Sequence, residues 1–161
     1  MISVYNERMQ AEGFSHNEAS AVLGDLVATE ASPSLSDPTY LDFDIAAVGL
    51  GFHHFDKPEL CIQRLAERLR PGTGVCLIID WLPKAHEPKH GGAGAAGEHD
   101  EMAAMNHTIK HQGFDEQHMR RLFEGAGLVD FAFVVLDEPL VLEMKGRRVE
   151  KTAFLARGRR A

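Results

Sequence analysis

Two apolar runs that lack a polar face constrain the fold of this chain more than any other feature. Residues 43–52 (FDIAAVGLGF) and 75–80 (VCLIID) are both of this kind. A strand with no polar face is buried on both sides, as it is in a parallel sheet. Apolar residues at helical spacing separate the two runs: Leu60, Ile62, Leu65 and Leu69. Strand, helix and strand in this order predict a βαβ unit with a right-handed crossover.

The segments before this unit are less regular. The spacing of apolar residues predicts a helix over residues 1–14 and a short strand over 19–26, where ASAVLGDL ends in Gly-Asp-Leu. Residues 31–40 are rich in serine and proline, which is typical of a loop. An opening helix with no strand before it is an unusual start for a domain.

The segments after the unit complete an α/β sandwich. We expect a flexible Gly/Ala/His-rich loop over residues 83–99, a helical piece over 101–110 and a helix over 115–125. Residues 129–136 and 149–156 are strand-like and are separated by turn residues, so we expect them to pair as an antiparallel hairpin. The prediction is a single domain over residues 1–161, with a mostly parallel sheet and a C-terminal antiparallel hairpin.

Composition narrows the class of protein. Hydrophobic residues make up 44% of the 161 residues and charged residues 25%, so the chain can form a core. A net charge of −7 argues against nucleic acid as a partner. Cys61 and Cys76 form no CxxC pair and are expected to be buried free thiols. No signal peptide and no apolar run long enough to span a bilayer is visible, so we expect a cytoplasmic protein without a membrane partner.

Four local features follow one another over most of residues 1–157. They are Gly24-Asp25-Leu26, the run from Asp44 through Val48-Gly49-Leu50-Gly51 to His53-His54-Phe55, the stretch Leu69-Arg70-Pro71-Gly72-Thr73-Gly74 before a strand ending in Asp80, and Gly113-Phe114 followed by a helix and Gly125-Ala126-Gly127-Leu128. In this order they resemble class I S-adenosylmethionine-dependent methyltransferases, whose fold is Rossmann-like. Thr73 departs from the family pattern, which has glycine there.

The resemblance implies S-adenosylmethionine as the cofactor and assigns residues to it. The acidic residue at the position of Asp25 accepts a hydrogen bond from the adenine amino group, and the residue after it, Leu26, packs on the purine. The strand end that faces the methionine part of the cofactor corresponds to Val48, Gly49 and Leu50, with His54 nearby. Ligands of open α/β sheets bind at this carboxyl end of the strands.

The resemblance begins at the family's second helix. The first strand, the glycine-rich loop, the first helix and the second strand are therefore expected to be missing, and the chain resembles a partial, N-terminally truncated domain. The strand at residues 43–52 should then have a bare apolar edge, which invites association. We expect a homo-oligomer, or a partner chain that supplies the missing half.

Two other patterns are set aside. Gly92-x-Gly94-x-x-Gly97 matches a dinucleotide fingerprint, but no strand precedes it and no apolar helix follows it. The histidine pairs His86/His90 and His107/His111 have i, i+4 spacing, yet no carboxylate or thiolate is fixed beside either pair, so no metal site is predicted.

Function follows from the resemblance alone. Methyl transfer from a sulfonium needs alignment and water exclusion more than acid–base chemistry, so catalytic residues are hard to identify. His107, His111 and Asp80 are the candidates for a base. The acidic composition favours a small-molecule acceptor. The alternative is a non-catalytic pseudo-methyltransferase, or a subunit that pairs with a partner chain.

The missing glycine-rich loop yields a first prediction. The isolated chain should bind S-adenosylmethionine poorly, because in the family that loop carries much of the cofactor contact. Isothermal titration calorimetry on the purified monomer measures this directly. A dissociation constant in the low micromolar range would contradict the prediction.

Overall fold

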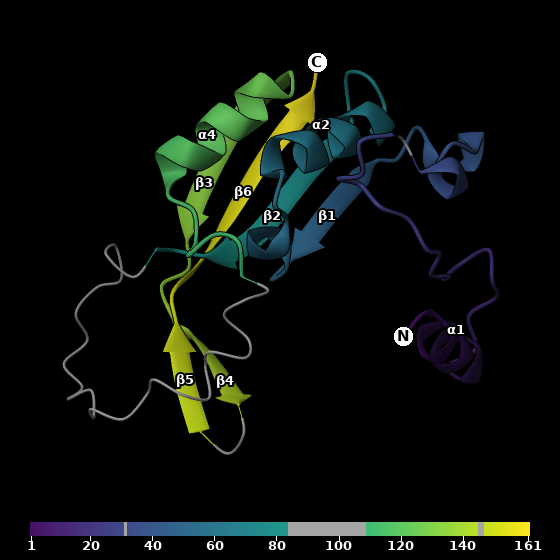
Figure 1. Ribbon diagram of the computed structural model, residues 1–161, viewed down its shortest axis with the longest axis horizontal. Helices are drawn as coiled ribbons and strands as arrows, with labels where there is room; N and C mark the ends of the chain where they lie inside the picture. Colours follow the sequence, from purple (N-terminus) through teal and green to yellow (C-terminus); the bar gives the residue numbers. More distant parts are fainter. Residues whose placement is uncertain (31, 84–108, 145–146) are drawn as a thin grey trace.

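The computed structural model describes residues 1–30, 32–83, 109–144 and 147–161 (Figure 1). Its helices and strands are α1 (Ile2–Ala11), β1 (Ile45–Gly49), α2 (Pro58–Arg68), β2 (Val75–Trp81), α4 (Glu116–Gly125), β3 (Leu128–Val135), β4 (Leu140–Met144), β5 (Arg147–Lys151) and β6 (Ala153–Arg160). Three short 3-10 helices lie between them, namely η1 (Pro33–Leu35), η2 (Pro38–Tyr40) and η3 (Phe52–His54). None of the described helices is long and apolar enough to cross a bilayer.

Four strands form the main sheet in the order β1-β2-β6-β3. β1 and β2 are parallel and joined through α2, which confirms the predicted βαβ unit. β6 lies antiparallel to both β2 and β3, so β1, β2 and β3 run in one direction and only β6 runs against them. The sheet is therefore mostly parallel in strand direction with an antiparallel C-terminal strand, as the sequence predicts.

The predicted hairpin differs in detail. Residues 149–156 do not form one strand but contribute to two, because the chain leaves β5 at Lys151 and enters β6 at Ala153. β3 pairs with β6, and β4 pairs with β5 in a separate two-stranded sheet. β4, which begins at Leu140, pairs with β5, the next strand in the sequence, and these two strands form the hairpin. The pairing of β3 with β6 joins segments that lie further apart in the sequence and completes the main sheet.

Both α2 and α4 lie on one face of the main sheet and contact each other (Figure 1). Their buried residues meet Cys76 and Ile78 of β2 and Phe154 of β6 in a single cluster. Asp115 caps α4, because its carboxylate accepts a hydrogen bond of 2.7 Å from the backbone N–H of His118. The core therefore lies between the sheet and this helix layer.

The two cysteines lie in this core. Cys61 of α2 and Cys76 of β2 are both free and buried, as expected from the sequence. Burial raises the pKa of each thiol to about 12. Both thiols therefore stay protonated and unreactive at neutral pH.

No described helix covers the opposite face of the sheet as α2 and α4 cover the first. Side chains of β2 alternate between buried residues on the helix side and half-buried residues on the other side. In β1 no residue is buried, and Ile45 is 60% exposed. The expectation that both strands of the βαβ unit are buried on two faces is therefore wrong, because α2 and α4 cover the same face.

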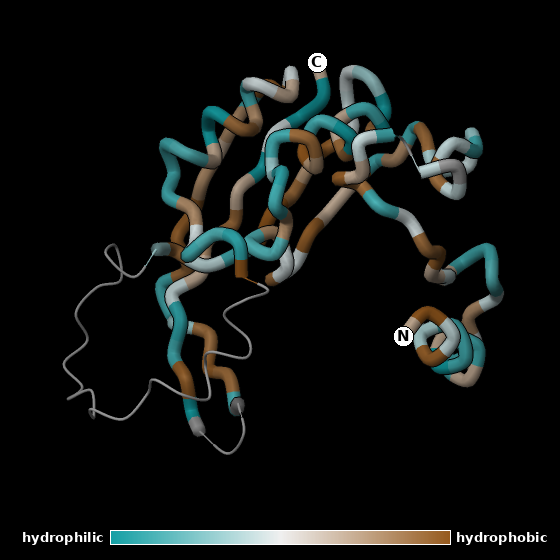
Figure 2. The backbone as a smooth tube through the Cα atoms, in the orientation of Figure 1, coloured by the Kyte–Doolittle hydropathy of each residue, from teal (hydrophilic) through white to brown (hydrophobic). Residues whose placement is uncertain are grey.

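The N-terminal segment is loosely attached. α1 buries no residue, and Figure 2 shows it standing apart from the sheet, beyond the β1 edge. The predicted strand over 19–26 does not form: residues 21–30 are irregular, and Ala21 pairs with the side-chain amide of Asn6 instead of with a strand. A strand needs a neighbour, and no described strand lies beside this segment. The predicted loop over 31–40 is irregular apart from η1 and η2.

Some predictions fall outside the described residues. They are the loop over 83–99 beyond Pro83, the helical piece over 101–110 up to residue 108, and the glycine pattern at 92–97.

Phe154 offers a test of the core. Its ring is fully buried and lies 4.7 Å from the ring of Phe133, centroid to centroid. Phe154→Ala should lower the free energy of unfolding by about 3–5 kcal/mol, because it removes a large side chain that the core cannot refill. Urea denaturation, followed by the fluorescence of the single tryptophan, Trp81, measures the change.

Val134→Ala is the matched control, since Val134 is 56% exposed on the neighbouring strand. Its free energy of unfolding should stay within about 0.5 kcal/mol of the native value. Equal losses in both variants would contradict the position of the core.

Candidate functional site

A buried histidine–aspartate pair lies where β1 and β2 end. His53 belongs to η3, which follows β1, and Asp80 is the penultimate residue of β2. Because the two strands are parallel, their carboxyl ends meet at the same edge of the sheet. The Nδ1 atom of His53 lies 2.7 Å from Oδ1 of Asp80, and both side chains are buried. This edge is where ligands bind in open α/β sheets.

Hydrogen bonds fix Asp80 from three directions. Its Oδ2 accepts the backbone N–H of His53 at 2.9 Å, and its Oδ1 accepts the backbone N–H of Trp81 at 2.7 Å. A carboxylate is only an acceptor, so the Nδ1 of His53 is the donor in their shared bond. In the neutral imidazole, Nε2 of His53 then carries no proton and can itself accept one.

The segment over residues 109–114 closes around this pair. The backbone N–H groups of Lys110 and His111 donate to the carbonyl of His53 at 3.0 and 3.1 Å. The backbone N–H of Phe114 donates to the carbonyl of Trp81 at 3.0 Å. The segment over residues 109–114 thus connects η3, which follows β1, to the end of β2.

His111 contributes a polar atom that lacks a partner. Its ring lies 5.2 Å from that of Phe114 and 6.5 Å from that of His118, centroid to centroid. Its Nε2 atom is buried and has no hydrogen-bond partner among the described residues. A buried ring nitrogen without a partner is costly, and a polar ligand group at this position would relieve that cost.

Four of the predicted cofactor residues lie on or directly after β1. Gly49 ends the strand, and a Cβ atom at this position would meet no atom within 4 Å, so its backbone is open. Leu50 has a left-handed backbone with φ of 54°, and its N–H donates to the carbonyl of Ile79. The ring of His54 lies 4.1 Å from that of His53. Val48 faces the helix side and packs against the core.

The other two predicted cofactor residues lie elsewhere. Leu26 lines a pocket of about 260 Å³ beside Phe43, Leu65 and Arg68, which is at the amino end of β1. The carboxylate of Asp25 accepts the backbone N–H groups of Val27 and Ala28 and so closes its own turn. A strand of five residues separates the two ends of β1 by roughly 13 Å. The structure therefore does not bring Asp25 and Leu26 to the site at His53.

The catalytic candidates have separate positions. Asp80 is fully buried behind His53, and His111 lies beside the pair. His107 lies outside the described residues. The sequence alone does not assign His53 to Asp80, although it singles out both, because 27 residues separate them. Across the described ranges, no three His, Cys, Asp or Glu side chains are arranged to hold a metal ion.

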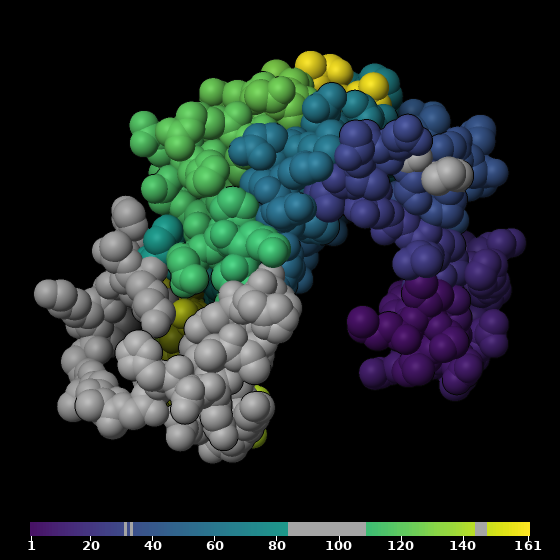
Figure 3. All heavy atoms as spheres, in the orientation of Figure 1, coloured from purple at the N-terminus to yellow at the C-terminus, as the bar shows by residue number. Residues whose placement is uncertain are grey.

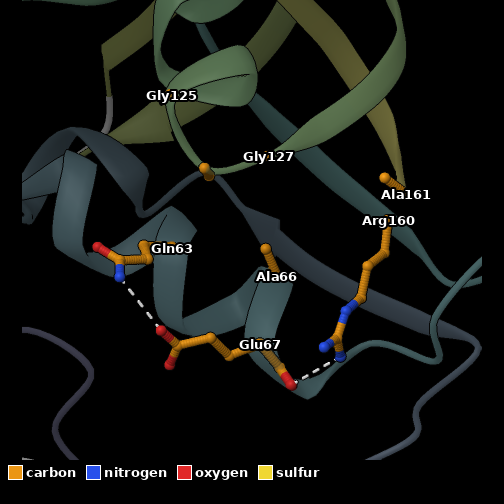
Figure 4. Close-up of a pocket in the computed structure, with 8 residues that line it drawn as sticks. Gln63, Ala66, Glu67, Gly125, Gly127, Arg160 and Ala161 are labelled. Carbon is orange, nitrogen blue, oxygen red and sulfur yellow. Dashed lines mark hydrogen bonds between the residues drawn. The ribbon is translucent and has the colours of Figure 1, made fainter.

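A second cavity, of about 470 Å³, lies at the other end of the strands from His53, between the ends of α2, α4 and β6 (Figure 4). The guanidinium of Arg160 donates to the carbonyl of Glu67 at 2.9 Å and also to the carbonyl of Leu69. Arg160 therefore caps the carboxyl end of α2, where the helix dipole favours a cation. This cavity contains none of the predicted site residues.

Comparisons place the fold. No protein-family model matches the chain, and no curated protein sequence does. Among solved structures, the YcgJ protein of Bacillus subtilis is 15% identical with a TM-score of 0.64, and the match covers 100% of this chain and 79% of that one. Phosphoethanolamine N-methyltransferase 2 of Haemonchus contortus, in complex with phosphomonomethylethanolamine and S-adenosylhomocysteine, is 12% identical with a TM-score of 0.62, and the match covers 99% and 41%.

A protein of the O-methyltransferase family from Burkholderia thailandensis is 14% identical with a TM-score of 0.56, and the match covers 99% of this chain and 40% of that one. The chain thus spans about four fifths of YcgJ and about two fifths of the other two. The TM-scores of these three matches show a shared fold. The chain has the fold of class I methyltransferases.

Gly113 tests how the site is held. Its φ is +114°, and a Cβ atom there would lie 2.7 Å from the backbone of Trp81 and Leu82. Gly113→Ala should displace the 109–114 segment and cost about 1–3 kcal/mol of stability. Urea denaturation measures the loss, and the emission of Trp81 reports the displacement.

Gly125→Ala is the control, because a Cβ atom there meets nothing within 4 Å and the residue ends a helix. It should be neutral, or stabilising by up to about 1 kcal/mol. If Gly113→Ala is equally neutral, the segment is not held by this close approach.

Proposed function

We propose that the chain takes part in S-adenosylmethionine-dependent methyl transfer to a small-molecule acceptor. The observation that carries the proposal is the buried pair of His53 and Asp80 at the carboxyl ends of β1 and β2. In a sheet of this fold, that edge is where ligands bind. A histidine held there by a carboxylate can take the proton that an acceptor loses when it is methylated.

The cofactor is supported by the fold and by an unpaired atom. The buried Nε2 of His111 has no partner among the residues that the structure describes, which fits a site that receives a polar ligand. Gly49, Leu50 and His54 are the residues of this chain that would hold the cofactor at the end of β1. When bound, S-adenosylmethionine supplies an electrophilic methyl group on a sulfonium. The Haemonchus contortus enzyme is a structural neighbour that has also been solved with this cofactor.

His53 and Asp80 have distinct roles in this proposal. Asp80 is a positioning residue, because it is fully buried and acts through the Nδ1 of His53. It fixes the imidazole orientation and keeps the proton on Nδ1, so Nε2 of His53 is the base. The ring of Trp81 lies 6.5 Å from that of His53 and helps to exclude water from the pair.

The acceptor is proposed as a small molecule with an ionisable O–H or N–H group. Such a group must lose a proton when it gains a methyl group, and this requirement gives a fixed histidine a function. The net charge of −7 disfavours nucleic acids. The neighbouring enzymes, described as an N-methyltransferase and a member of an O-methyltransferase family, are consistent with both kinds of group.

Substitution of the pair tests the proposal. His53→Gln and Asp80→Asn should each lower turnover by about 10²–10⁴-fold, since general base catalysis contributes that much. The assay follows transfer of a tritiated methyl group from saturating S-adenosylmethionine to a panel of amines and phenols. The loss should shrink as pH rises towards the pKa of the acceptor, because the acceptor then loses its proton to solvent without a base.

His118→Gln is the control, because His118 lies near the site but does not contact Asp80. It should leave turnover within a few-fold of the native rate. If the His53→Gln variant turns over at the native rate, His53 is not the general base. A chain that transfers no methyl group to any acceptor, even at millimolar cofactor, would favour the non-catalytic alternative.

A further inference from the structure

The pocket beside the amino end of β1 combines an apolar wall with a cation. Its volume is about 260 Å³, and most of its lining is apolar, namely Val22, Leu26, Leu35, Phe43 and Leu65. Arg68 and Tyr40 complete the lining. The histidine–aspartate pair lies at the other end of β1, so this pocket is separate from the site proposed for methyl transfer.

Described contacts hold the walls of the pocket together. The backbone N–H of Phe43 donates to the carbonyl of Arg68 at 3.0 Å, and the carbonyl of Phe43 accepts the N–H of Arg70 at 2.8 Å. The NH2 atom of Arg68 donates to the carbonyl of Leu35 at 3.4 Å. Figure 3 shows the loop over residues 34–43, in blue-violet, against the side of the body that α2 and β1 form. The pocket is thus a junction between this loop and α2.

Two arginines beside the loop lack a counter-charge. Arg64 and Arg68 lie one turn apart on the same side of α2. The NH1 atom of Arg64 and the Nε atom of Arg68 are buried, and neither has a hydrogen-bond partner among the described residues. No ion pair within the described ranges includes either arginine, although the chain has 24 acidic and 17 basic residues. A buried donor without an acceptor is costly, and like charges at this spacing repel.

A purely structural role accounts for only part of this arrangement. Arg68 lies in the last turn of α2, where the helix dipole favours a cation, and its NH1 donates to the carbonyl of Arg64 at 2.7 Å. That role uses neither the Nε of Arg68 nor the guanidinium of Arg64. The hydroxyl of Tyr40 also forms no hydrogen bond with a described residue. An acceptor is therefore missing on the side of Arg68 that carries Nε.

We propose that this pocket binds a small carboxylic acid with an apolar body, in its ionised form. The carboxylate accepts two hydrogen bonds from the Nε and NH2 atoms of Arg68, and it replaces the carbonyl of Leu35 as the partner of NH2. This paired geometry is the one that a guanidinium offers to a carboxylate. Tyr40 donates a further hydrogen bond, and Arg64 adds a second positive charge one turn away.

The size and the walls of the pocket limit the ligand further. Pockets for drug-sized molecules begin at roughly 300 Å³, and this one is smaller, so the apolar body is a short chain or a single ring. The body lies against Leu26, Leu35 and Phe43 and is removed from water there. Inorganic phosphate fits less well, because a dianion needs more donors than an apolar wall provides.

Calorimetric titration of the chain with matched probes tests the proposal. Octanoate should bind with a dissociation constant below about 1 mM. 1-Octanol has the same chain without the charge, and acetate has the charge without the chain, so each should bind at least about tenfold more weakly. Inorganic phosphate and adenosine should not compete with octanoate.

Three variants connect octanoate binding to named side chains. Arg68→Gln should raise the dissociation constant at least about tenfold, because it removes the paired hydrogen bonds. Arg64→Gln should raise it about two- to fivefold, because it removes charge alone. Val22→Trp should abolish binding by filling the pocket, and Val22 is 42% exposed, so the fold tolerates the larger side chain. Arg121→Gln is the control, since it makes the same charge change on the exposed side of α4.

Amide NMR spectra separate this pocket from the proposed methyl-transfer site. Octanoate should shift the signals of Gly24, Leu35 and Phe43 and leave those of His53 and Trp81 in place. Turnover in the methyl-transfer assay is a different measurement, so failure of one proposal leaves the other intact.

The proposal is overturned by any of five results. They are no binding of octanoate at millimolar concentration, equal binding of 1-octanol, an unchanged dissociation constant in folded Arg68→Gln, competition by phosphate or adenosine, and NMR shifts that gather at His53. Circular dichroism shows whether each variant is folded. If Arg68→Gln does not fold, Val22→Trp and the comparison of octanoate with 1-octanol decide.

Discussion

The two backbone ladders of β6 hold this structure together. β6 pairs along seven residues with β2 on one side and along most of its length with β3 on the other. Without it, β3 would have no described strand beside it, although α4 would still contact α2 of the βαβ unit. Because β6 lies between β2 and β3 in the sheet, its buried residues Phe154, Ala156 and Gly158 meet the helix layer between the contributions of those two strands. Gly158 has no room for a side chain, since a Cβ atom would lie 2.6 Å from the ring of Phe123.

The candidate site depends on the same arrangement. Once β1 and β2 are parallel neighbours, the residues that follow them meet at one edge, and His53 comes within hydrogen-bond distance of Asp80. The carboxylate is buried, so it is stable only because three N–H groups point at it. These bonds also connect η3 to the end of β2. The chemistry and the packing of this edge therefore use the same contacts.

Sequence patterns predict the local elements well and the long-range pairings poorly. The βαβ unit is predicted correctly because apolar runs and helical spacing are local signals. The strand expected over 19–26 is wrong, because a strand forms only where a neighbour exists. The break between β5 and β6 is not visible in the sequence, because residues 149–156 contain no glycine or proline to mark it. The pairing of His53 with Asp80 could not be predicted, since it depends on strand direction and on the turn of η3.

The position of β6 in the sequence also affects how the chain can acquire its fold. β2 is made early, yet its partner strand follows more than 70 residues later, because Val75 pairs with Arg159 and Trp81 with Ala153. During synthesis, β2 and β3 therefore wait with unpaired edges until residues 153–160 have left the ribosome. Contacts of such high sequence separation slow folding and prolong the exposure of apolar strands. The main sheet is thus completed only after translation of its last strand.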